Sequence, residues 1–280
     1  MREPSKGSKG SPGRAPAFCL LLCGMVSGSV LAQPAPGGGG TTLSARFDVA
    51  NAYVLRGIMQ DDTGVIMWPA AELDVVVKAG GHRGAGRMAV TLGTWNSLHT
   101  GAAGSDGLGK LWYQSDFYAG FAVGTGAGLR VGATYLARTS PNNAFPSVTE
   151  VIVNVGAPSN WVSPYALVAF ELQGQLDGGR RKGKYLELGV RPTIGRRLSL
   201  AMPAKVGLSL GDYYEGLRGD ERFGFVSIGG VASLPLGGGP RAGGWNVHGG
   251  ADYIRLGDRN QLVSGKTQQV VVSGGIGLAY

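Results

Sequence analysis

Ionisable side chains recur at every second position along several segments, which places them on one shared face if those segments are extended. Fixed charges that line a narrow, water-filled passage bias which ions and solutes enter it through the local electrostatic potential. The alternative is that these charges pair across strands and fill a small interior. The charged residues on this polar parity are Arg46, Asp48, Arg56, Glu72, Asp74, Asp116, Arg130, Arg138, Glu187, Arg191, Lys205 and Asp252.

Residues that catalysis or metal binding would require are sparse. The segment from Gly104 to Lys110 matches G-x-x-x-x-G-K, but Leu111 stands where a phosphate-binding loop needs Ser or Thr for Mg²⁺. The three histidines, His82, His99 and His248, are too dispersed for a zinc site, and none has a second ligand at i+2 or i+4. His248 falls on the polar parity, away from any lipid substrate. We therefore expect no enzyme, no metal site and no cofactor.

Alternation of apolar and polar residues with period two is the dominant pattern from Leu43 onward and predicts β-strands. The chain contains 51 glycines, and each would cost the interior of a helix roughly 1 kcal/mol relative to Ala, which argues against a helical bundle. Disorder is excluded for most of the chain, because 43% of its residues are hydrophobic and only 16% are charged. The alternating segments are residues 46–56, 71–78, 88–93, 116–123, 129–138, 149–155, 161–172, 185–191, 198–210, 223–236, 245–256 and 268–280.

The connections between these twelve segments alternate in length. Those that follow even-numbered segments are short and rich in Gly, Pro or Asn, whereas those that follow odd-numbered segments tend to be longer and polar. Short turns at one end and long loops at the other are typical of an outer-membrane barrel. The sequence therefore predicts an all-β fold, a transmembrane antiparallel up-and-down β-barrel of about 12 strands with both termini at the turn end.

A soluble β-sandwich would also alternate, so the position of aromatic residues helps to decide between the two folds. Aromatic residues near strand ends are expected to form the girdles of a membrane barrel. The girdle candidates are Tyr53, Trp68, Trp95, Trp112, Tyr135, Trp245, Tyr253 and Tyr280. The alternating C-terminal strand ends on Tyr280, which is similar to the signal that barrel-assembly machinery recognises in Gram-negative outer membranes.

The first 32 residues have the organisation of a secretory signal peptide. A basic stretch precedes the apolar segment 17–32, which ends on Val30-Leu31-Ala32 as a small-residue cleavage site. A lipoprotein signal would need a small residue before the modified cysteine, but Leu22 precedes Cys23. We expect a signal peptide at 1–32, a flexible N-terminus at 33–42 and the barrel at 43–280. Removal of the signal peptide lowers the formal charge from +8 to +5, a moderate value that weakens any nucleic-acid role.

Several short motifs resemble those of the TorF family of putative porins. The segment Tyr53-Val-Leu-Arg-Gly-Ile-Met-Gln60 resembles the opening signature of that family, approximately Y-V-F-R-G-hydrophobic-S-Q. Further similar segments follow in order: Gly93-Thr-Trp-Asn-Ser97, Asp116-Phe-Tyr-Ala-Gly-Phe121 and Gly132-Ala-Thr-Tyr135. The similarity is clearest over residues 43–156. Departures include Leu55, where an aromatic is expected, and Met59, where Ser is expected. The resemblance implies an outer-membrane barrel assigned as a porin and offers no catalytic residues.

These observations predict an outer-membrane, porin-like channel for passive diffusion of small hydrophilic solutes or ions. The alternatives are a closed barrel with a structural, adhesion or lipid-contacting role and a lipid-modifying barrel enzyme. The expected partners are outer-membrane lipid, lipopolysaccharide, the barrel-assembly machinery and small solutes, and no nucleic acid. The basic segment 178–184, Gly-Gly-Arg-Arg-Lys-Gly-Lys, either contacts lipopolysaccharide phosphates or is a solvated loop.

Overall fold

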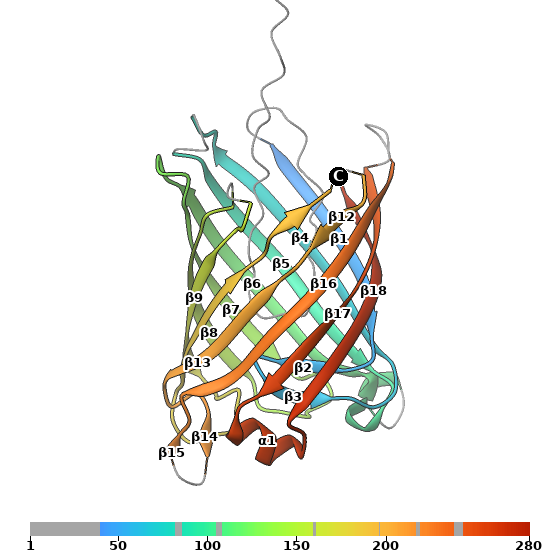
Figure 1. Cartoon of the computed structure of the whole chain (residues 1–280), viewed down its shortest axis with the longest axis vertical. Coiled ribbons are helices and arrows are strands. Elements are labelled where there is room, and N and C mark those ends of the chain that lie inside the picture. The colour runs from blue at the N-terminus through green and yellow to red at the C-terminus, as the bar shows by residue number, and fades with distance from the viewer. Residues whose placement is uncertain are drawn as a thin grey trace, which may run out of the picture.

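The computed structural model describes residues 40–81, 86–104, 108–158, 161–195, 197–216, 219–237 and 243–280. Within these residues, twelve antiparallel strands pair in sequence order, and β18 pairs with β1 to close the ring (Figure 1). The predicted all-β barrel and its strand number are confirmed. The strands are β1 (Thr41–Ala50), β4 (Ile66–Lys78), β5 (Met88–His99), β6 (Trp112–Gly124), β7 (Arg130–Thr139), β8 (Val148–Gly156), β9 (Tyr165–Gln173), β10 (Lys184–Val190), β13 (Ala204–Gly211), β16 (Phe223–Gly237), β17 (Gly244–Leu256) and β18 (Gln268–Ala279).

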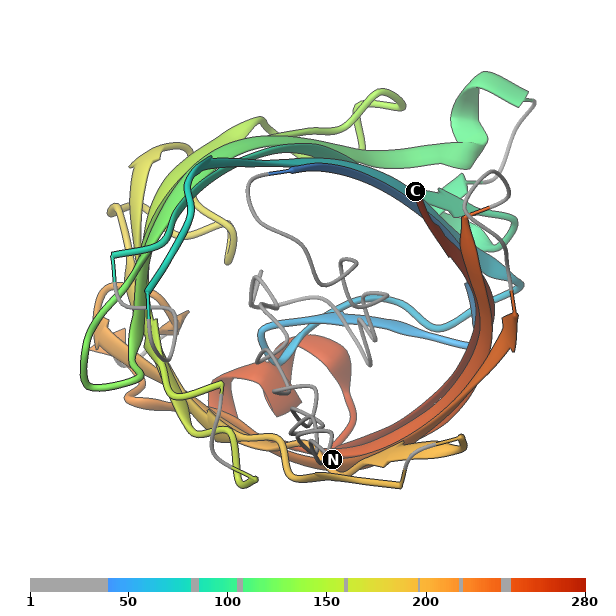
Figure 2. The same cartoon turned by 90° about the horizontal axis from the view of Figure 1, so that it is seen from above.

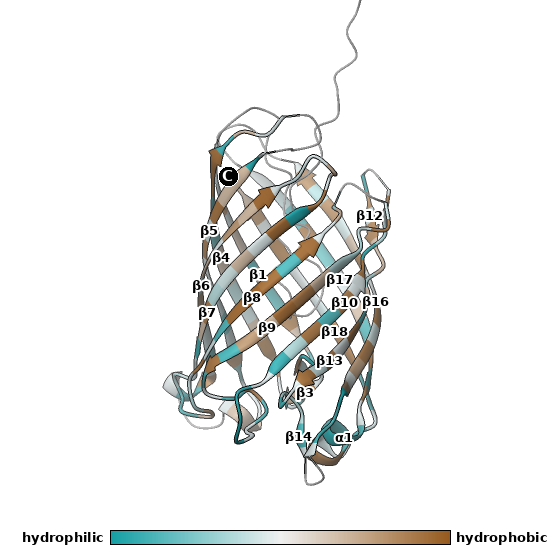
Figure 3. Cartoon of the chain, turned by 90° about the vertical axis from the view of Figure 1, so that its left-hand side faces the viewer, coloured by the Kyte–Doolittle hydropathy of each residue, from teal (hydrophilic) through white to brown (hydrophobic). Residues whose placement is uncertain are grey.

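Large apolar side chains occupy the outward positions of the barrel strands. Phe47 of β1 is 40% exposed and Phe117 of β6 is 57% exposed, whereas their neighbours Asp48 and Asp116 are buried on the inner face. Figure 3 shows hydrophobic and hydrophilic residues following one another along the barrel strands. A soluble sandwich would bury its apolar face, so this distribution is that of a barrel whose exterior meets lipid. No helix in the described residues is long and apolar enough to cross a membrane.

The two ends of the barrel differ as the lengths of the connections predict. The long connections carry the small elements: β2 (Tyr53–Leu55), β3 (Ile58–Asp61), 3₁₀ turns at Ala102–Gly104 and Leu108–Leu111, β14 (Glu215–Gly216), β15 (Gly219–Asp220) and α1 (Asp258–Ser264). In Figure 1 they lie at the bottom of the barrel, and the C-terminus lies at the top. Leu43 and Tyr280 exchange two backbone hydrogen bonds of 2.8 Å at the upper end. The predicted signal peptide, the predicted flexible segment up to residue 39 and His82 lie outside the described residues.

The bounds of several predicted strands differ from those in the structure, including β4 and β5, which are longer than predicted, and two strands depart most. The first was expected to run over 46–56, but β1 ends at Ala50 and the chain then leaves the wall. The ninth, expected over 198–210, is divided into β12 (Ser199–Ala201) and β13. Pro203 interrupts the ladder because proline has no backbone N–H to donate. The short strand β11 (Thr193–Ile194) pairs with β12 beyond the end of β10.

Two inward-facing glycines allow tyrosine rings to lie flat against the wall. A Cβ atom at Gly93 would overlap the ring of Tyr118, and the same arrangement recurs at Gly189 with the ring of Tyr165. The flat ring of Tyr118 donates a hydrogen bond of 3.0 Å from its hydroxyl to Glu72. Because these glycines have no side chain, the two tyrosine rings can lie against the wall and do not project into the interior.

Replacing Gly93 by Ala is expected to lower the free energy of unfolding by about 1–3 kcal/mol, because the new methyl group displaces the Tyr118 ring. Urea-induced unfolding of the refolded barrel measures this loss. The matched control is Gly230→Ala on β16, where a Cβ would meet no atom within 4 Å. Equal stability of the Gly93→Ala and Gly230→Ala variants would contradict the packing argument.

Candidate functional site

A β-hairpin formed by β2 and β3 folds into the barrel between β1 and β4. Leu55 pairs with Ile58, so the turn consists of Arg56 and Gly57, whose φ angles are 49° and 78°. Positive φ at both central residues is the geometry of a type I′ turn, which fits the twist of a two-stranded hairpin. Figure 2 shows the hairpin crossing the interior of the ring of strands. The strands β1 and β4 stay paired up to Ala50 and Ile66, at the base of this segment.

Arg56 at the hairpin tip is held by partners from distant parts of the chain. Its Nη1 donates hydrogen bonds to Glu150 Oε1 at 2.6 Å and to the hydroxyl of Tyr213 at 2.7 Å. The Arg56 guanidinium lies 4.7 Å from the ring centroid of Tyr185, and the hydroxyl of Tyr214 donates to the Arg56 carbonyl at 2.8 Å. Burial disfavours its charge, but the Glu150 carboxylate and the hydroxyls of Tyr213 and Tyr185 together outweigh burial and raise the pKa of Arg56. The hairpin tip therefore carries a fixed positive charge inside the barrel.

Arg56 is part of a network of ion pairs that extends to residues on the barrel wall. Glu150 of β8 also lies 3.7 Å from Nη1 of Arg138 on β7, and Arg138 Nε lies 3.3 Å from Asp116 on β6. All four side chains are almost fully buried. Each of the four charges has a partner of opposite sign, as buried charges require, although Arg56 Nε, Arg138 Nη1 and Glu150 Oε2 make no hydrogen bond among the described residues. Glu150 was not among the charges selected from the sequence, although its alternation with Val151 and Val153 marks it as inward-facing.

The base of the hairpin is attached to the wall at β5. Asp61 Oδ2 lies 2.8 Å from His99 Nδ1, and His99 Nε2 lies 2.7 Å from Ser97 Oγ. Trp68 donates its indole N–H to Ser97 at 3.0 Å. The order of the Ser, His and Asp groups matches that of a catalytic triad, but Ser97 has no exposed surface and already accepts the Trp68 bond. The arrangement anchors the hairpin through a buried chain of hydrogen bonds.

Replacing Asp61 by Asn is expected to destabilise the barrel by about 1–3 kcal/mol at neutral pH, because a buried imidazole loses its charged acceptor. Burial raises the pKa of Asp61, but hydrogen bonds from Thr63 and His99 outweigh burial and hold the pKa below its ordinary value of 3.8. The carboxylate therefore contributes stability above that ordinary value, and this contribution disappears as pH falls through the lowered pKa.

Unfolding of wild-type and Asp61→Asn proteins over a pH series measures this contribution. The difference in stability should be largest at neutral pH and should vanish in strong acid. The comparison variant is Asp258→Asn, at the exposed start of α1. A stability difference that stays constant down to strong acid would show that the Asp61 charge does not hold the hairpin.

A closed antiparallel barrel with an apolar exterior and a charged interior is the architecture of the β-barrels that span the outer membranes of bacteria. The protein is a bacterial outer-membrane barrel. No protein-family model and no curated protein matches the chain.

Solved structures to which the chain is similar are also barrels. An outer membrane channel from Pseudomonas putida has 10% identity, with 97% of this chain and 100% of that chain covered and a TM-score of 0.46. The NanC porin has 11% identity, with 84% and 98% covered and a TM-score of 0.44. The translocator domain of the autotransporter NalP from Neisseria meningitidis has 13% identity, with 87% and 88% covered and a TM-score of 0.38.

The other charges of the outer-membrane barrel that were selected from sequence mostly have partners of opposite charge or hydrogen-bond donors. On β1, Arg46 Nε lies 2.8 Å from Asp48, which also lies 2.5 Å from Nε2 of His248. On β10, Glu187 accepts a 2.7 Å hydrogen bond from Tyr185 and lies 3.7 Å from Nζ of Lys205.

The remaining selected charges lie apart from the hairpin network. Asp74 accepts a 2.5 Å hydrogen bond from Thr91. Arg130 and Asp252 are buried, with exposed fractions of 5% and 6%. Arg191 lies beyond the end of β10, where its backbone N–H donates to Val162. The structure therefore brings Arg56, Arg138 and Asp116 into one network and places the other selected charges outside it.

Three of the predicted girdle residues do not lie on the outer surface. Tyr53 belongs to the hairpin, and Trp68 and Trp95 face inward from β4 and β5, so all three are at most 3% exposed. Their rings pack together, with centroid distances of 5.4–6.1 Å, beside His99 and Tyr113. The prediction was wrong for Tyr53 because β1 ends at Ala50, so Tyr53 is no longer part of the wall. It was wrong for Trp68 and Trp95 because the hairpin inside the barrel needs apolar side chains to pack against. Large exposed fractions place the others outside: Trp112, Tyr135, Trp245, Tyr253 and Tyr280.

Within the described ranges, no group of three or more His, Cys, Asp or Glu residues could hold a metal ion. What the interior offers is a set of fixed charges of both signs around a hairpin. Such an arrangement creates an electric field across the interior and offers hydrogen bonds to a polar solute.

Proposed function

We propose that the barrel is a porin-like channel through which small hydrophilic solutes or ions diffuse passively. The observation that supports the proposal is the inward hairpin, whose tip carries the charged Arg56 opposite the wall residues Glu150 and Arg138. A loop that folds inward narrows a barrel, and charges of both signs at that level select among solutes by size and polarity. In this proposal the partly exposed interior charges, such as Arg46 and Lys205, line the passage, and the buried network around Arg56 acts on solutes through its electric field.

Passage needs no conformational change of the wall in this mechanism. A solute that enters from the loop end exchanges part of its hydration shell for the polar interior groups and leaves at the turn end. The field between cationic Arg56 and anionic Asp116 orients dipolar solutes. Since cations and anions both meet favourable partners, we expect weak selectivity between them.

Single-channel recording of the refolded protein in a planar bilayer tests the proposal. Stepwise currents that grow with salt concentration are expected, with a reversal potential close to that of a weakly selective pore. Absence of stepwise current in every salt tested would contradict it. Heat-modifiable migration on a denaturing gel verifies that the sample used in the bilayer is a folded barrel.

A closed barrel with a structural, adhesion or lipid-contacting role is the second candidate, and the density of the interior favours it. Gln114, Asp116 and His99 have no exposed surface although their side chains face inward. A small barrel whose interior is filled by side chains conducts nothing. The same recordings distinguish the two functions, and we infer no enzymatic activity in either case.

We further propose that the chain is a member of the TorF family, as the motifs from Tyr53 to Tyr135 suggest. In this proposal residues 1–32 are removed as a signal peptide, and the barrel-assembly machinery recognises the strand that ends at Tyr280. Mass spectrometry of protein purified from outer membranes tests the cleavage after Ala32. Deletion of Tyr280 tests the assembly signal, with loss of barrel from the membrane as the expected result.

A further inference from the structure

The loop between β9 and β10 displays a cluster of basic side chains, here called the basic loop and defined as residues 174–184. Arg180, Arg181, Lys182 and Lys184 are all exposed. Sequence alone leaves open whether this loop is merely solvated, because neighbouring carboxylates could neutralise it. The positions of those carboxylates therefore decide what the loop can bind.

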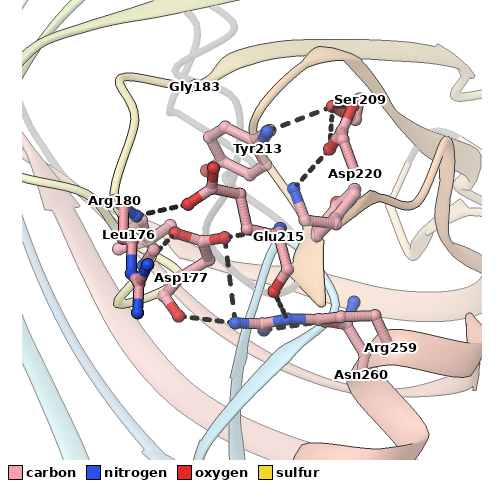
Figure 4. A network of polar contacts seen from close by, with 12 residues as sticks. Leu176, Asp177, Arg180, Gly183, Ser209, Tyr213, Glu215, Asp220, Arg259 and Asn260 are labelled. Atoms are coloured by element: carbon pink, nitrogen blue, oxygen red, sulfur yellow. Dashed lines mark hydrogen bonds and ion pairs between the residues drawn. The ribbon is translucent and has the colours of Figure 1, made fainter. Parts of the chain in front are cut away.

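The backbone of the basic loop and of the adjacent segment occupies the nearest carboxylates (Figure 4). Glu215 accepts hydrogen bonds from the backbone N–H groups of Arg180 and Arg181. Asp177 accepts from the backbone N–H groups of Gly179 and Glu215, each at 2.7 Å. Glu171 accepts likewise from two further N–H groups of the loop, at 2.6 and 2.7 Å. These carboxylates fix the shape of the loop through its main chain, because they accept hydrogen bonds from its backbone N–H groups and not from its basic side chains.

The basic side chains are accordingly available to another anion. Arg181 lies 3.5 Å from Asp212, but 74% of its side-chain surface is exposed. Among the described residues, no carboxylate lies within ion-pair distance of the side chains of Arg180, Lys182 or Lys184. Arg259 of α1 adds rigidity, because its Nη2 donates to the Asp177 carbonyl at 2.5 Å.

The basic loop lies directly at the edge of the apolar exterior. Lys184 is the first residue of β10 and pairs with Phe170 of β9, which is 38% exposed on the outer face. Leu172 and Leu210, at the same end of neighbouring strands, are 43% and 53% exposed. The long loops of an outer-membrane barrel face the cell exterior, so this edge meets the outer leaflet. A lysine there can lay its methylene stem on lipid and direct its ammonium group to the head-group level.

We propose that the basic loop binds the phosphate groups of lipopolysaccharide in the outer leaflet. Arginine forks match phosphate oxygens in paired hydrogen bonds, and lysine adds a mobile point charge. The loop offers both, on a backbone already fixed by Asp177 and Glu215. The proposal rests on the outer-membrane placement of the barrel and is independent of whether the barrel conducts, so failure of the bilayer recordings leaves it intact.

The test uses the full refolded barrel, purified lipopolysaccharide and two matched double variants. Arg180→Gln/Lys184→Gln removes two cations from the basic loop. Lys78→Gln/Arg197→Gln removes one lysine and one arginine that are exposed at the turn end. We expect the dissociation constant for lipopolysaccharide to rise about tenfold or more in the first variant and to stay at the wild-type value in the second.

Two further probes identify the ligand group. Enzymatically dephosphorylated lipopolysaccharide should bind wild-type protein as weakly as intact lipopolysaccharide binds the loop variant. Vesicles of phosphatidylglycerol should bind both double variants equally. Equal lipopolysaccharide affinity of the two variants, or unchanged binding after dephosphorylation, would overturn the proposal. A preference for phosphatidylglycerol that depends on the loop would also overturn it, by assigning the loop to anionic lipid in general.

Discussion

Replacement of Glu150 by Leu is expected to lower the free energy of unfolding by about 3–5 kcal/mol, since one partner of a buried ion pair is removed and uncompensated charge remains. Glu150 is fully buried and lies at 2.6 Å from Arg56 and 3.7 Å from Arg138. Arg138 retains Asp116 after the substitution, but Arg56 keeps only the neutral hydroxyl of Tyr213 as a hydrogen-bond acceptor for its Nη1. Denaturant unfolding of the refolded barrel in lipid vesicles measures the loss.

A double variant separates the stability lost through changed packing from the stability lost because the Arg56 guanidinium is left without its carboxylate partner. Glu150→Leu/Arg56→Met should recover much of the lost stability, because no unpaired guanidinium remains at the hairpin tip. The surface control is Asp212→Asn, which removes the exposed partner of Arg181 and should cost at most about 1 kcal/mol. Strictly additive losses for Glu150 and Arg56 would contradict their coupling.

Removal of the hairpin is expected to raise single-channel conductance several-fold. Ala50 and Ile66 are cross-strand partners, so a two-residue Asn-Gly turn can replace residues 51–65 without moving β1 or β4. Such a variant loses the inward segment and the Arg56 charge while it keeps the wall intact. Conductance depends on the narrowest cross-section of the passage, which the hairpin is proposed to set.

The control for this deletion is Arg56→Gln, which removes the charge and leaves the hairpin in place. It should alter the preference between cations and anions more than the conductance itself. If the deletion variant folds, as heat-modifiable migration shows, and conducts no better than wild type, the hairpin is not the constriction. Conductance that appears only after deletion would establish that the wild-type barrel is closed.

Most of the barrel could be predicted from the sequence because alternate residues of a barrel strand face lipid and the interior. Once one residue of a strand is assigned to a face, the faces of the others follow. Once Phe47 and Val49 are assigned to the outside, Asp48 must face inward, and the same logic holds around the ring. Alternating loop lengths then give the direction of each strand. The hairpin escaped prediction because Tyr53 and Leu55 continue the same alternation after the chain has left the wall.

The interior network was harder to predict for a different reason. Parity identifies Arg138 and Asp116 as inward-facing, but it does not say that Glu150 and the hairpin residue Arg56 converge on them from distant parts of the chain. Likewise, Ser97 and His99 share a face of β5, yet their link to Asp61 depends on the hairpin. Contacts that cross the interior require the three-dimensional path of a loop, which no local pattern encodes.

The hairpin has a mechanical consequence that follows from where its two ends are attached. Its base is joined to β5 through Asp61 and His99, and its tip reaches Tyr213, which follows β13 on the other side of the ring. A barrel held only by the hydrogen bonds between its strands can flatten under lateral pressure, whereas a segment attached to two opposite sides of the wall opposes that deformation. The hairpin therefore links opposite sides of the wall, and squeezing the barrel at right angles to it would lengthen this axis and require breaking the Arg56–Tyr213 hydrogen bond at one end or the Asp61–His99 link at the other.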